Sequence, residues 1–308
     1  MDPRVIYITG QAFSGSTFLA ALLGTHPDIE PVSELAKWTK GYLRRHERLC
    51  ACGKTASECE FWTAVEGQWV SATRPKALPK YVQLQDKFEH ISSIWINRLA
   101  KDPHPTSEFA EYQVLTEALF RSIMHVSNRS MIVDSSKLPG RALAISRMHG
   151  LDVSVIHLVR DGNQFLRSSV RRGRLAAGPG PNLLYKTFAL GLSWSITNLA
   201  AEYVLSASRR NSLRVRYEDL VSDPIRTIME IGSKVGLDTS SIQKVLEQNQ
   251  PIPYRHMASG SHHRTLGAKT VIAEHEQGPE IGRRQILAFR LGAAAVSSRY
   301  GYSWRKPG

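Results

Sequence analysis

The sequence predicts an α/β protein with an open, mainly parallel sheet flanked by helices. Three observations support this prediction: short apolar runs typical of buried strands alternate with helical segments, the first run ends in a glycine-rich loop, and that loop opens a helix. With 308 residues, 42% of them hydrophobic, the chain can bury a sizeable core, and we expect one domain over residues 1–308.

Each predicted strand is a short apolar run bounded by turn residues. Strands are expected at residues 5–9, 131–133, 153–159 and 213–215, with a short extended stretch at 29–32 and a strand-like run at 270–273. Helices are expected at residues 16–23, about 139–149, about 162–171 and, as a buried helix, 183–205. Residues 173–181 and 264–269 are expected to be loops.

A long helical insertion, about residues 36–128, separates the first predicted strand–helix unit from the strand at 131–133. Its apolar side chains recur at helical spacing in two stripes: Phe88, Ile91, Trp95 and Leu99, then Phe109, Tyr112, Leu115, Leu119 and Ile123. Such stripes are typical of helices that pack one face into a core. Because of its place in the chain, we expect the insertion to contribute to a ligand site.

Charge and composition limit the class of protein. Forty Lys and Arg residues against 27 Asp and Glu give a formal charge of +13, which attracts anionic ligands. We find no zinc finger, RNP motif or basic heptad helix, so no specific nucleic-acid partner is expected. The N-terminus lacks a signal-peptide pattern, and the apolar run 183–205 contains Lys186, Asn198 and Glu202. We therefore expect a cytoplasmic protein without a transmembrane segment.

Residues Gly10 to Thr17 join the first strand to the first helix, where a phosphate-binding loop would lie. Loop amides and the start of a helix together attract an anion. The glycine spacing matches the Walker A loop, which predicts a sheet like that of P-loop nucleoside triphosphatases, but Ser16 stands where that loop has lysine. The missing lysine argues against an ATPase, GTPase or kinase. The alternative is a strand-to-helix turn that binds no ligand.

Three further motifs follow predicted strands and should reach the same sheet edge. Arg160 ends the third strand, with Ser168 two helical turns beyond it, and an arginine with a hydroxyl suits a phosphate monoester. Lys137 follows the second strand and Tyr217 the fourth. The alternatives are an ion pair between Arg160 and Asp161 that caps the following helix, a helix cap with a solvated lysine for Lys137, and a turn held by carboxylates for the stretch of Tyr217.

Three cysteines, Cys50, Cys52 and Cys59, lie close together in the chain. With His46 they would offer zinc a set of three sulfurs and one nitrogen, but their spacing is unusual for such a site. A loop stabilised by packing, or a facultative disulfide, is favoured instead. No metal-binding residue is predicted.

Taken together, these motifs resemble the sulfotransferases that use 3′-phosphoadenosine 5′-phosphosulfate (PAPS). Ser14-Gly15-Ser16-Thr17 is similar to their 5′-phosphosulfate loop, and Arg160 with Ser168 is similar to their 3′-phosphate motif. Residues 216–220 are similar to a stretch that follows a central strand in that family. The segment from Cys50 to Trp62 is similar to a bacterial-type branch.

The resemblance also implies roles for single residues. Residues 26–34 are similar to the carbohydrate and tyrosylprotein branches, where a glutamate serves as base, and this glutamate maps onto Glu34. Lys137 matches a lysine near the transferring group, so Glu34 and Lys137 are the expected catalytic pair. Tyr217 is expected at the adenine. Many members carry a basic residue where this chain has Phe13, so Lys137 or an arginine elsewhere must supply that charge.

The expected reaction is in-line transfer of a sulfuryl group from PAPS to an acceptor hydroxyl, which releases 3′-phosphoadenosine 5′-phosphate (PAP) and needs no metal. Glycan, glycolipid, peptide and small-molecule acceptors all remain open, as does the oligomeric state. The rival hypotheses are a nucleotide or small-molecule kinase, which would require Mg²⁺, and a catalytically silent module that binds PAP.

Overall fold

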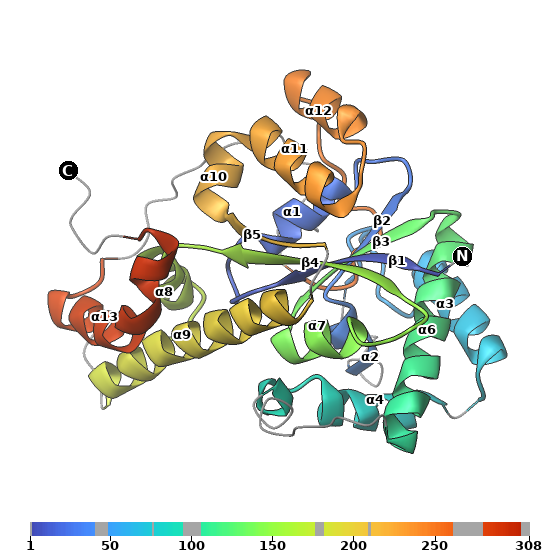
Figure 1. Ribbon diagram of the computed structural model, residues 1–308, viewed down its shortest axis with the longest axis horizontal. Coiled ribbons are helices and arrows are strands. Elements are labelled where there is room, and N and C mark those ends of the chain that lie inside the picture. Colours follow the sequence, from blue (N-terminus) through green and yellow to red (C-terminus); the bar gives the residue numbers. More distant parts are fainter. Residues whose placement is uncertain are drawn as a thin grey trace.

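The structure is a computed structural model that describes residues 2–40, 49–75, 77–94, 106–175, 182–208, 211–260 and 280–302. At its centre lies a five-stranded sheet with the strand order β2-β3-β1-β4-β5 (Figure 1). The strands are β1 (Arg4–Thr9), β2 (Ile29–Ser33), β3 (Met131–Lys137), β4 (Asp152–Val159) and β5 (Ser212–Arg216). Every pairing between them is parallel, which confirms the predicted fold class.

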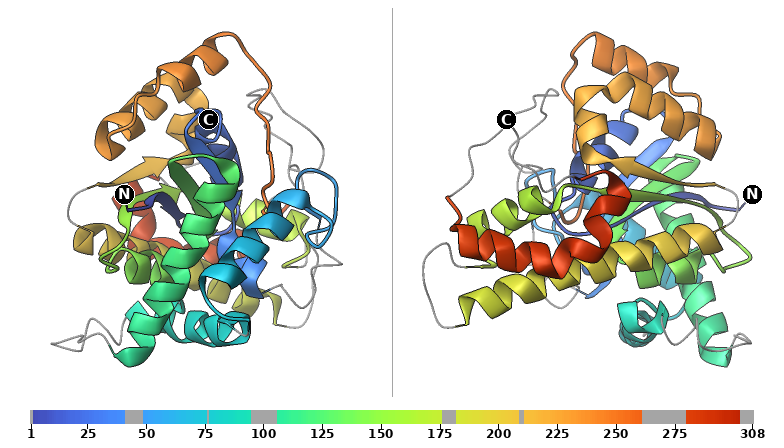
Figure 2. Two further views of the ribbon diagram at one scale, coloured as in Figure 1. Left: turned by 90° about the vertical axis from the view of Figure 1, so that its right-hand side faces the viewer. Right: turned by 60° about the vertical axis from the view of Figure 1, so that its left-hand side comes forward.

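Helices cover both faces of the sheet, as Figures 1 and 2 show. They are α1 (Ser16–Leu23), α2 (Leu35–Lys40), α3 (Glu60–Ala72), α4 (Ala77–Phe88), α6 (Ser107–Ser127), α7 (Pro139–Ile145), α8 (Gly162–Arg171), α9 (Leu183–Ala207), α10 (Tyr217–Ser222), α11 (Pro224–Val235), α12 (Ser240–Glu247) and α13 (Arg283–Ser297), followed by the 3₁₀ turn η3 (Ser298–Tyr300).

The central strand β1 supplies two hydrophobic cores because its side chains alternate between the faces of the sheet. Ile6 and Ile8 pack with α1, α11 and α12 on one face. Val5 and Tyr7 pack on the other face with α7, α9 and the helices of the insertion. Burial on both faces explains why this parallel strand has an unbroken apolar sequence rather than an alternating one.

The insertion is helical, as predicted, and α3, α4 and α6 bury their apolar stripes against the sheet and each other. Tyr112 and Leu119 of the second stripe are fully buried, while Phe88 and Ile91 of the first are partly buried against the same core. Trp95 and Leu99 lie outside the described residues, as do residues 176–181 of the first predicted loop and the predicted segments 264–269 and 270–273.

Two element boundaries differ from the prediction by four residues, and the others by at most two. The strand predicted at 131–133 continues to Lys137, and α7 ends at Ile145 rather than near residue 149. The residues added to β3 include Asp134 and Ser136, which are polar yet buried. They can remain in the strand because hydrogen bonds inside the protein satisfy their side chains.

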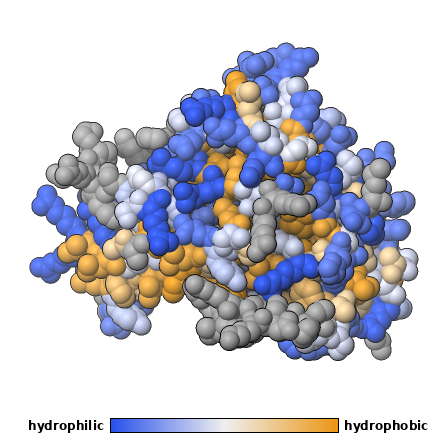
Figure 3. Space-filling model, viewed as in Figure 1, coloured by the Kyte–Doolittle hydropathy of each residue, from blue (hydrophilic) through white to orange (hydrophobic). Residues whose placement is uncertain are grey.

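Helix α9 is only half buried, which corrects the prediction of a buried helix. Trp194 and Asn198 are enclosed, whereas the opposite face exposes the large apolar side chains Leu184, Tyr185, Phe188, Leu192 and Ile196. Figure 3 shows the resulting hydrophobic surface where α9 and α13 lie, at the left of the view. No helix among the described residues is long and apolar enough to span a membrane.

Candidate active site

Sheet topology brings the predicted motifs to one edge. Strand β1 lies between β3 and β4 and is parallel to both, so the carboxyl ends of all three strands meet where ligands bind in open α/β sheets. The loop after β1, Lys137 at the end of β3 and Arg160 after β4 therefore become neighbours. The amide of Gly10 and the hydroxyl of Thr9 both donate to the Lys137 carbonyl at 3.2 Å.

The loop from Gly10 to Gly15 has a backbone that requires its glycines. Gly10 has φ 140°, and a Cβ there would lie 2.4 Å from the Leu158 carbonyl oxygen. Gly15 has φ 89°, and a Cβ there would lie 2.3 Å from the Tyr217 ring. Ser16 and Thr17 begin α1 and are both buried. The loop is thus pressed between β4 and Tyr217, with the N-terminus of α1 behind it.

Arg160 contacts this loop and the Tyr217 ring. Its Nη1 donates to the Phe13 carbonyl at 3.0 Å, and its guanidinium lies 4.5 Å from the centre of the Tyr217 ring. Within the described part of the chain, two buried polar atoms here have no hydrogen-bond partner, Arg160 Nε and Ser14 Oγ. Buried polar atoms are normally paired, so these two identify a place where a polar ligand would complete the hydrogen bonding.

The structure shows only part of the alternative for Arg160. Asp161 caps α8, as that alternative predicts, and accepts from the amides of Asn163 at 2.8 Å and Gln164 at 3.1 Å, but no ion pair in the part of the chain that the structure describes joins it to Arg160. Ser168 lies in α8 and is buried, but no hydrogen bond among the described residues joins its hydroxyl to Arg160. The structure therefore brings Arg160, Tyr217 and the loop into contact, with Ser168 on the helix that Arg160 precedes.

Glu34 and Lys137 meet directly as an ion pair. Glu34 follows β2 at the same edge, is 4% exposed, pairs also with Lys37, and accepts from the Ser259 hydroxyl at 3.1 Å. Burial raises the pKa of Glu34, but the two lysines outweigh it and lower the pKa to about 2. Burial also lowers the pKa of Lys137, against the opposing effect of Glu34. The structure thus brings the two residues of the expected catalytic pair into direct contact.

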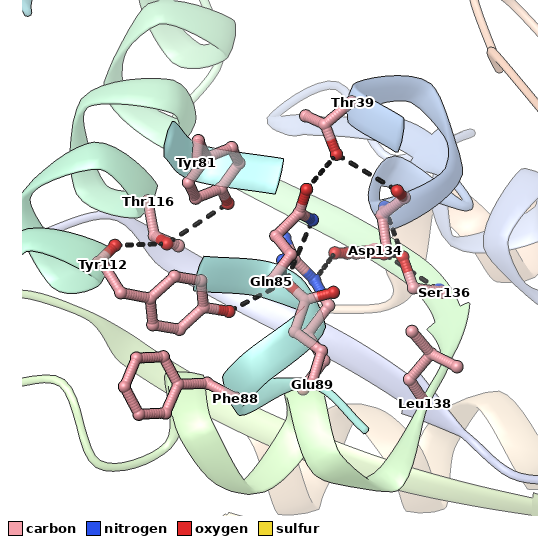
Figure 4. Close-up of polar contacts among 12 residues, drawn as sticks. Thr39, Tyr81, Gln85, Phe88, Glu89, Tyr112, Thr116, Asp134, Ser136 and Leu138 are labelled. Carbon is pink, nitrogen blue, oxygen red and sulfur yellow. Dashed lines mark hydrogen bonds and ion pairs between the residues drawn. The ribbon is translucent and has the colours of Figure 1, made fainter. Parts of the chain in front are cut away.

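A buried polar network lies next to this pair in the chain, and Figure 4 shows its members Glu89, Asp134 and Ser136. Arg141 is fully enclosed and forms ion pairs with Glu89 and with Asp134, whose Oδ2 lies 3.0 Å from Arg141 Nε. Asp134 accepts from the amide of Ser136 at 2.9 Å. The Ser136 hydroxyl in turn accepts from the amide of Ala36 at 3.0 Å. Because Ser136 precedes Lys137 and Ala36 follows Glu34 closely, the network joins β3 to the start of α2.

The structure also places beside the candidate site three residues that were not predicted from the sequence: Arg174, Ser259 and Gly260. The guanidinium of Arg174 lies 4.7 Å from the centre of the Phe13 ring, which places a cation beside the loop position that lacks one. Gly260 has φ 129°, and a Cβ there would lie 2.8 Å from both Ser33 Oγ and Thr17 Oγ1. The basic run after α8 was a usable signal for Arg174. Nothing local in the sequence marked Ser259 or Gly260.

The stretch after β5 combines the predicted site residue with the turn proposed as its alternative. Tyr217 faces the loop, whereas Glu218 points elsewhere: its carboxylate accepts from the amide of Asp161 at 3.0 Å and from the hydroxyl of Tyr302 at 2.7 Å. These bonds tie α10 to the start of α8. They therefore fix Tyr217 relative to Arg160 across two strands of the sheet.

Comparisons with known proteins agree with this architecture. The model of the sulfotransferase family matches residues 3–241. A sulfotransferase structure from Mycobacterium tuberculosis aligns with TM-score 0.51 and 13% identity over 96% of this chain and 78% of that one. A sulfotransferase domain from the curacin biosynthetic pathway aligns with TM-score 0.49 and 14% identity over 98% of this chain and 99% of that one. A sulfotransferase domain from the Synechococcus PCC 7002 olefin synthase aligns with TM-score 0.48 and 17% identity over 99% of this chain and 97% of that one. No curated protein matches the sequence.

The open parallel sheet and the loop between β1 and α1 define the P-loop-like class of α/β proteins. The family match over most of the chain then places it more narrowly: this chain belongs to the sulfotransferase family. This confirms the resemblance found in the sequence and supports a transferase activity.

Proposed function

We propose that the protein transfers a sulfuryl group from PAPS to a hydroxyl of its acceptor. The observation that carries this proposal is the lysine-free loop closed against Arg160, with Ser14 Oγ and Arg160 Nε buried and unpaired. Arginine forms strong hydrogen bonds with phosphate. A 3′-phosphate at Arg160 would distinguish PAPS from ATP, and the loop amides with the N-terminus of α1 would hold the 5′-phosphosulfate.

In this proposal the ion pair between Glu34 and Lys137 changes partners during the reaction. The anionic donor attracts Lys137, whose bond to Glu34 weakens, and the carboxylate becomes a better proton acceptor. Glu34 takes the proton of the acceptor hydroxyl while the acceptor oxygen bonds to sulfur. The bond from sulfur to the phosphate oxygen breaks, PAP leaves with that electron pair, and Lys137 stabilises its charge.

The positions of the other site residues suggest their roles in the proposed reaction. Arg174 beside Phe13 supplies the cation that many family members carry within the loop. Ser168 completes the 3′-phosphate site if the ligand draws Arg160 and α8 together, and Tyr217 supports the adenine. Glu34 immediately precedes α2, the first helix of the insertion, so residues 36–128 supply the surface on which the acceptor binds.

Thermal unfolding with nucleotides tests the donor assignment. PAP at about 100 times its Kd should stabilise the protein by about 2.7 kcal/mol, while ADP and ATP at equal concentration stabilise it far less. Arg160→Ala should weaken PAP binding about 10- to 100-fold and remove most of the preference, because bonds to a charged group are lost. Arg226→Ala, an exposed arginine of α11, should retain the preference. Equal shifts with all three nucleotides would contradict the proposal.

A further inference from the structure

Three cysteines and a histidine from distant parts of the chain converge outside the transfer site. Cys50, Cys52 and Cys59 precede α3, and His256 lies in the segment after α12. One ligand atom from each of these four residues, hereafter the cysteine–histidine cluster, lies within 4.8 Å of all the others. His46, the histidine considered from the sequence, lies outside the described residues.

The spacing of the cluster matches a tetrahedral zinc site. Zinc bonds of about 2.3 Å to sulfur and about 2.0 Å to nitrogen place two sulfurs about 3.8 Å apart and a sulfur and nitrogen about 3.5 Å apart. The Cys59 sulfur lies 3.7 Å from the sulfurs of Cys50 and Cys52. The Nδ1 of His256 lies 3.4 Å from the sulfur of Cys59 and 4.0 Å from that of Cys50.

The backbone around the cluster is organised as a ligand loop. The Gly53 amide donates to the Cys50 carbonyl at 3.0 Å in a tight turn, and Gly53 has φ 88°. The Cys50 amide also donates to the Lys54 carbonyl at 2.9 Å, which closes this turn.

The histidine is held as firmly as the cysteines. Phe61 stacks on the His256 ring at 4.9 Å between ring centres, and the indole of Trp62 donates to the His256 carbonyl at 2.7 Å. The Ala51 amide donates to the Met257 carbonyl at 3.1 Å. The imidazole is therefore fixed toward the three sulfurs before any metal binds.

We propose that Cys50, Cys52, Cys59 and His256 bind one Zn²⁺ as a structural site. Three thiolates and one imidazole in a closed tetrahedron are ligands that zinc prefers, and four protein ligands leave no open position for catalysis. A disulfide would pair Cys59 with only one of its two sulfur neighbours and would leave the third cysteine and the histidine without a role. All three cysteines are free in this structure.

The site would connect the insertion to the transfer site. The metal joins the loop before α3 to the segment that contains His256, and Ser259 of this segment donates to Glu34. Gly260 packs against Ser33, the last residue of β2, and against Thr17 at the start of α1. A zinc ion at the cluster would therefore fix the segment that lies over the base and the phosphate loop, although it takes no part in the chemistry.

Metal analysis of the full chain, purified under reducing conditions without chelator, tests this proposal independently of sulfuryl transfer. We expect inductively coupled plasma mass spectrometry to find about one zinc ion per chain. Replacement of zinc by Co²⁺ should give the visible absorption of a tetrahedral ion and a near-ultraviolet thiolate band. Cys59→Ser and His256→Ala should lose most of the zinc, while His90→Ala, an exposed histidine of the insertion, should retain it.

Because the cysteine variant is at risk of misfolding, the unmodified protein provides a second measurement. Titration with a thiol-specific mercurial should release zinc to a coloured chelator in proportion to the thiols consumed. Absence of zinc together with no Co²⁺ absorption would overturn the proposal. A disulfide between Cys59 and either neighbour in the reduced preparation, or equal zinc in all variants, would overturn it as well.

Discussion

Glu34 is 4% exposed and faces two ammonium groups and a hydroxyl. A carboxylate in this environment is fully ionised at neutral pH, yet it accepts protons poorly because the cations stabilise its charge. The ion pair therefore keeps the Glu34 carboxylate charged but makes it a poor proton acceptor. Under our proposal, only an anion that competes for Lys137 releases it, which would couple proton acceptance to donor binding.

Replacing Glu34 tests its role as base. Glu34→Gln should lower turnover by about 10²- to 10⁴-fold and leave PAP affinity within a few-fold, because the amide cannot accept the acceptor proton. Lys137→Ala should lower turnover and also weaken PAPS binding. Steady-state kinetics and PAP titration measure both effects, with Glu230→Gln on α11 as an exposed control. Turnover within a few-fold of the parent in both variants would exclude this catalytic pair.

The low pKa of Glu34 predicts a pH dependence of stability. Its pKa is about 2 in the folded protein and about 4.3 when unfolded. The folded state thus favours the ionised form, and this stabilisation is present above pH ~4.3 and disappears as the pH falls through 2. Chemical unfolding should show a difference between parent and Glu34→Gln that is constant above pH ~5 and shrinks toward pH 2. A difference already absent at pH ~4 would contradict the prediction.

At the scale of elements, two glycines set how closely α9 and α13 approach. A Cβ on Gly191 would lie 2.3 Å from the Phe289 carbonyl oxygen, and one on Gly292 would lie 2.3 Å from that of Phe188. These contacts are with backbone atoms, which cannot rotate away. Because α9 and α13 cross this closely, α13 lies beside α8. There Phe289 of α13 packs against Phe165 of α8, with ring centres 6.1 Å apart.

Two glycine-to-alanine substitutions test this crossing, one at the contact between α9 and α13 and one at an open position in another helix. Gly191→Ala should destabilise the protein by about 1–3 kcal/mol, because the two helices must separate. Gly67→Ala lies in the middle of α3 with nothing within 4 Å of the new methyl group, so it should stabilise by about 0.5–1 kcal/mol. Denaturant unfolding measures both changes. Similar stabilisation by both substitutions would show that the helices do not depend on this contact.

At the scale of the whole molecule, the chain carries a formal charge of +13, and three of its cationic residues lie at the edge of the sheet that holds the candidate site. Lys137, Arg160 and Arg174 all lie around the loop. Among the described residues, the cysteine–histidine cluster is the group with metal-ligand spacing, and it includes no residue of the loop. The proposed transfer site thus has cationic side chains of its own that can neutralise an anionic donor.

Sulfuryl transfer should therefore proceed without Mg²⁺. Brief exposure to EDTA should leave activity unchanged, and added Mg²⁺ should not increase it, because protein cations stabilise the leaving phosphate. A transfer assay with labelled PAPS and a cell extract as acceptor source measures this. Complete loss of activity restored by Mg²⁺ would contradict this prediction, and Mg²⁺-dependent phosphoryl transfer from ATP in a parallel assay would favour a kinase instead. Prolonged chelation that removes the proposed zinc should lower the melting temperature before it alters the chemistry.

The sequence by itself determined the fold class, the approximate positions of the five strands and the edge of the sheet at which the candidate site lies. Buried parallel strands need unbroken apolar runs, and the carboxyl ends of such strands share one edge, so a motif that directly follows a strand can be placed without a structure. This reasoning located the loop, Arg160, Lys137 and Tyr217. Glu34 came from the family resemblance, and the structure places it at the same edge.

Only the tertiary structure decided which side chains meet across long stretches of chain. Local patterns record whether a residue is buried but not which partner it contacts, so Ser259 against Glu34 and His256 against the cysteines had no local signal. The same limit hid the direct contact of Glu34 with Lys137, which depends on how β2 and β3 pair. It also hid the buried polar end of β3, because Asp134 tolerates burial through its contacts with Arg141 and the Ser136 amide.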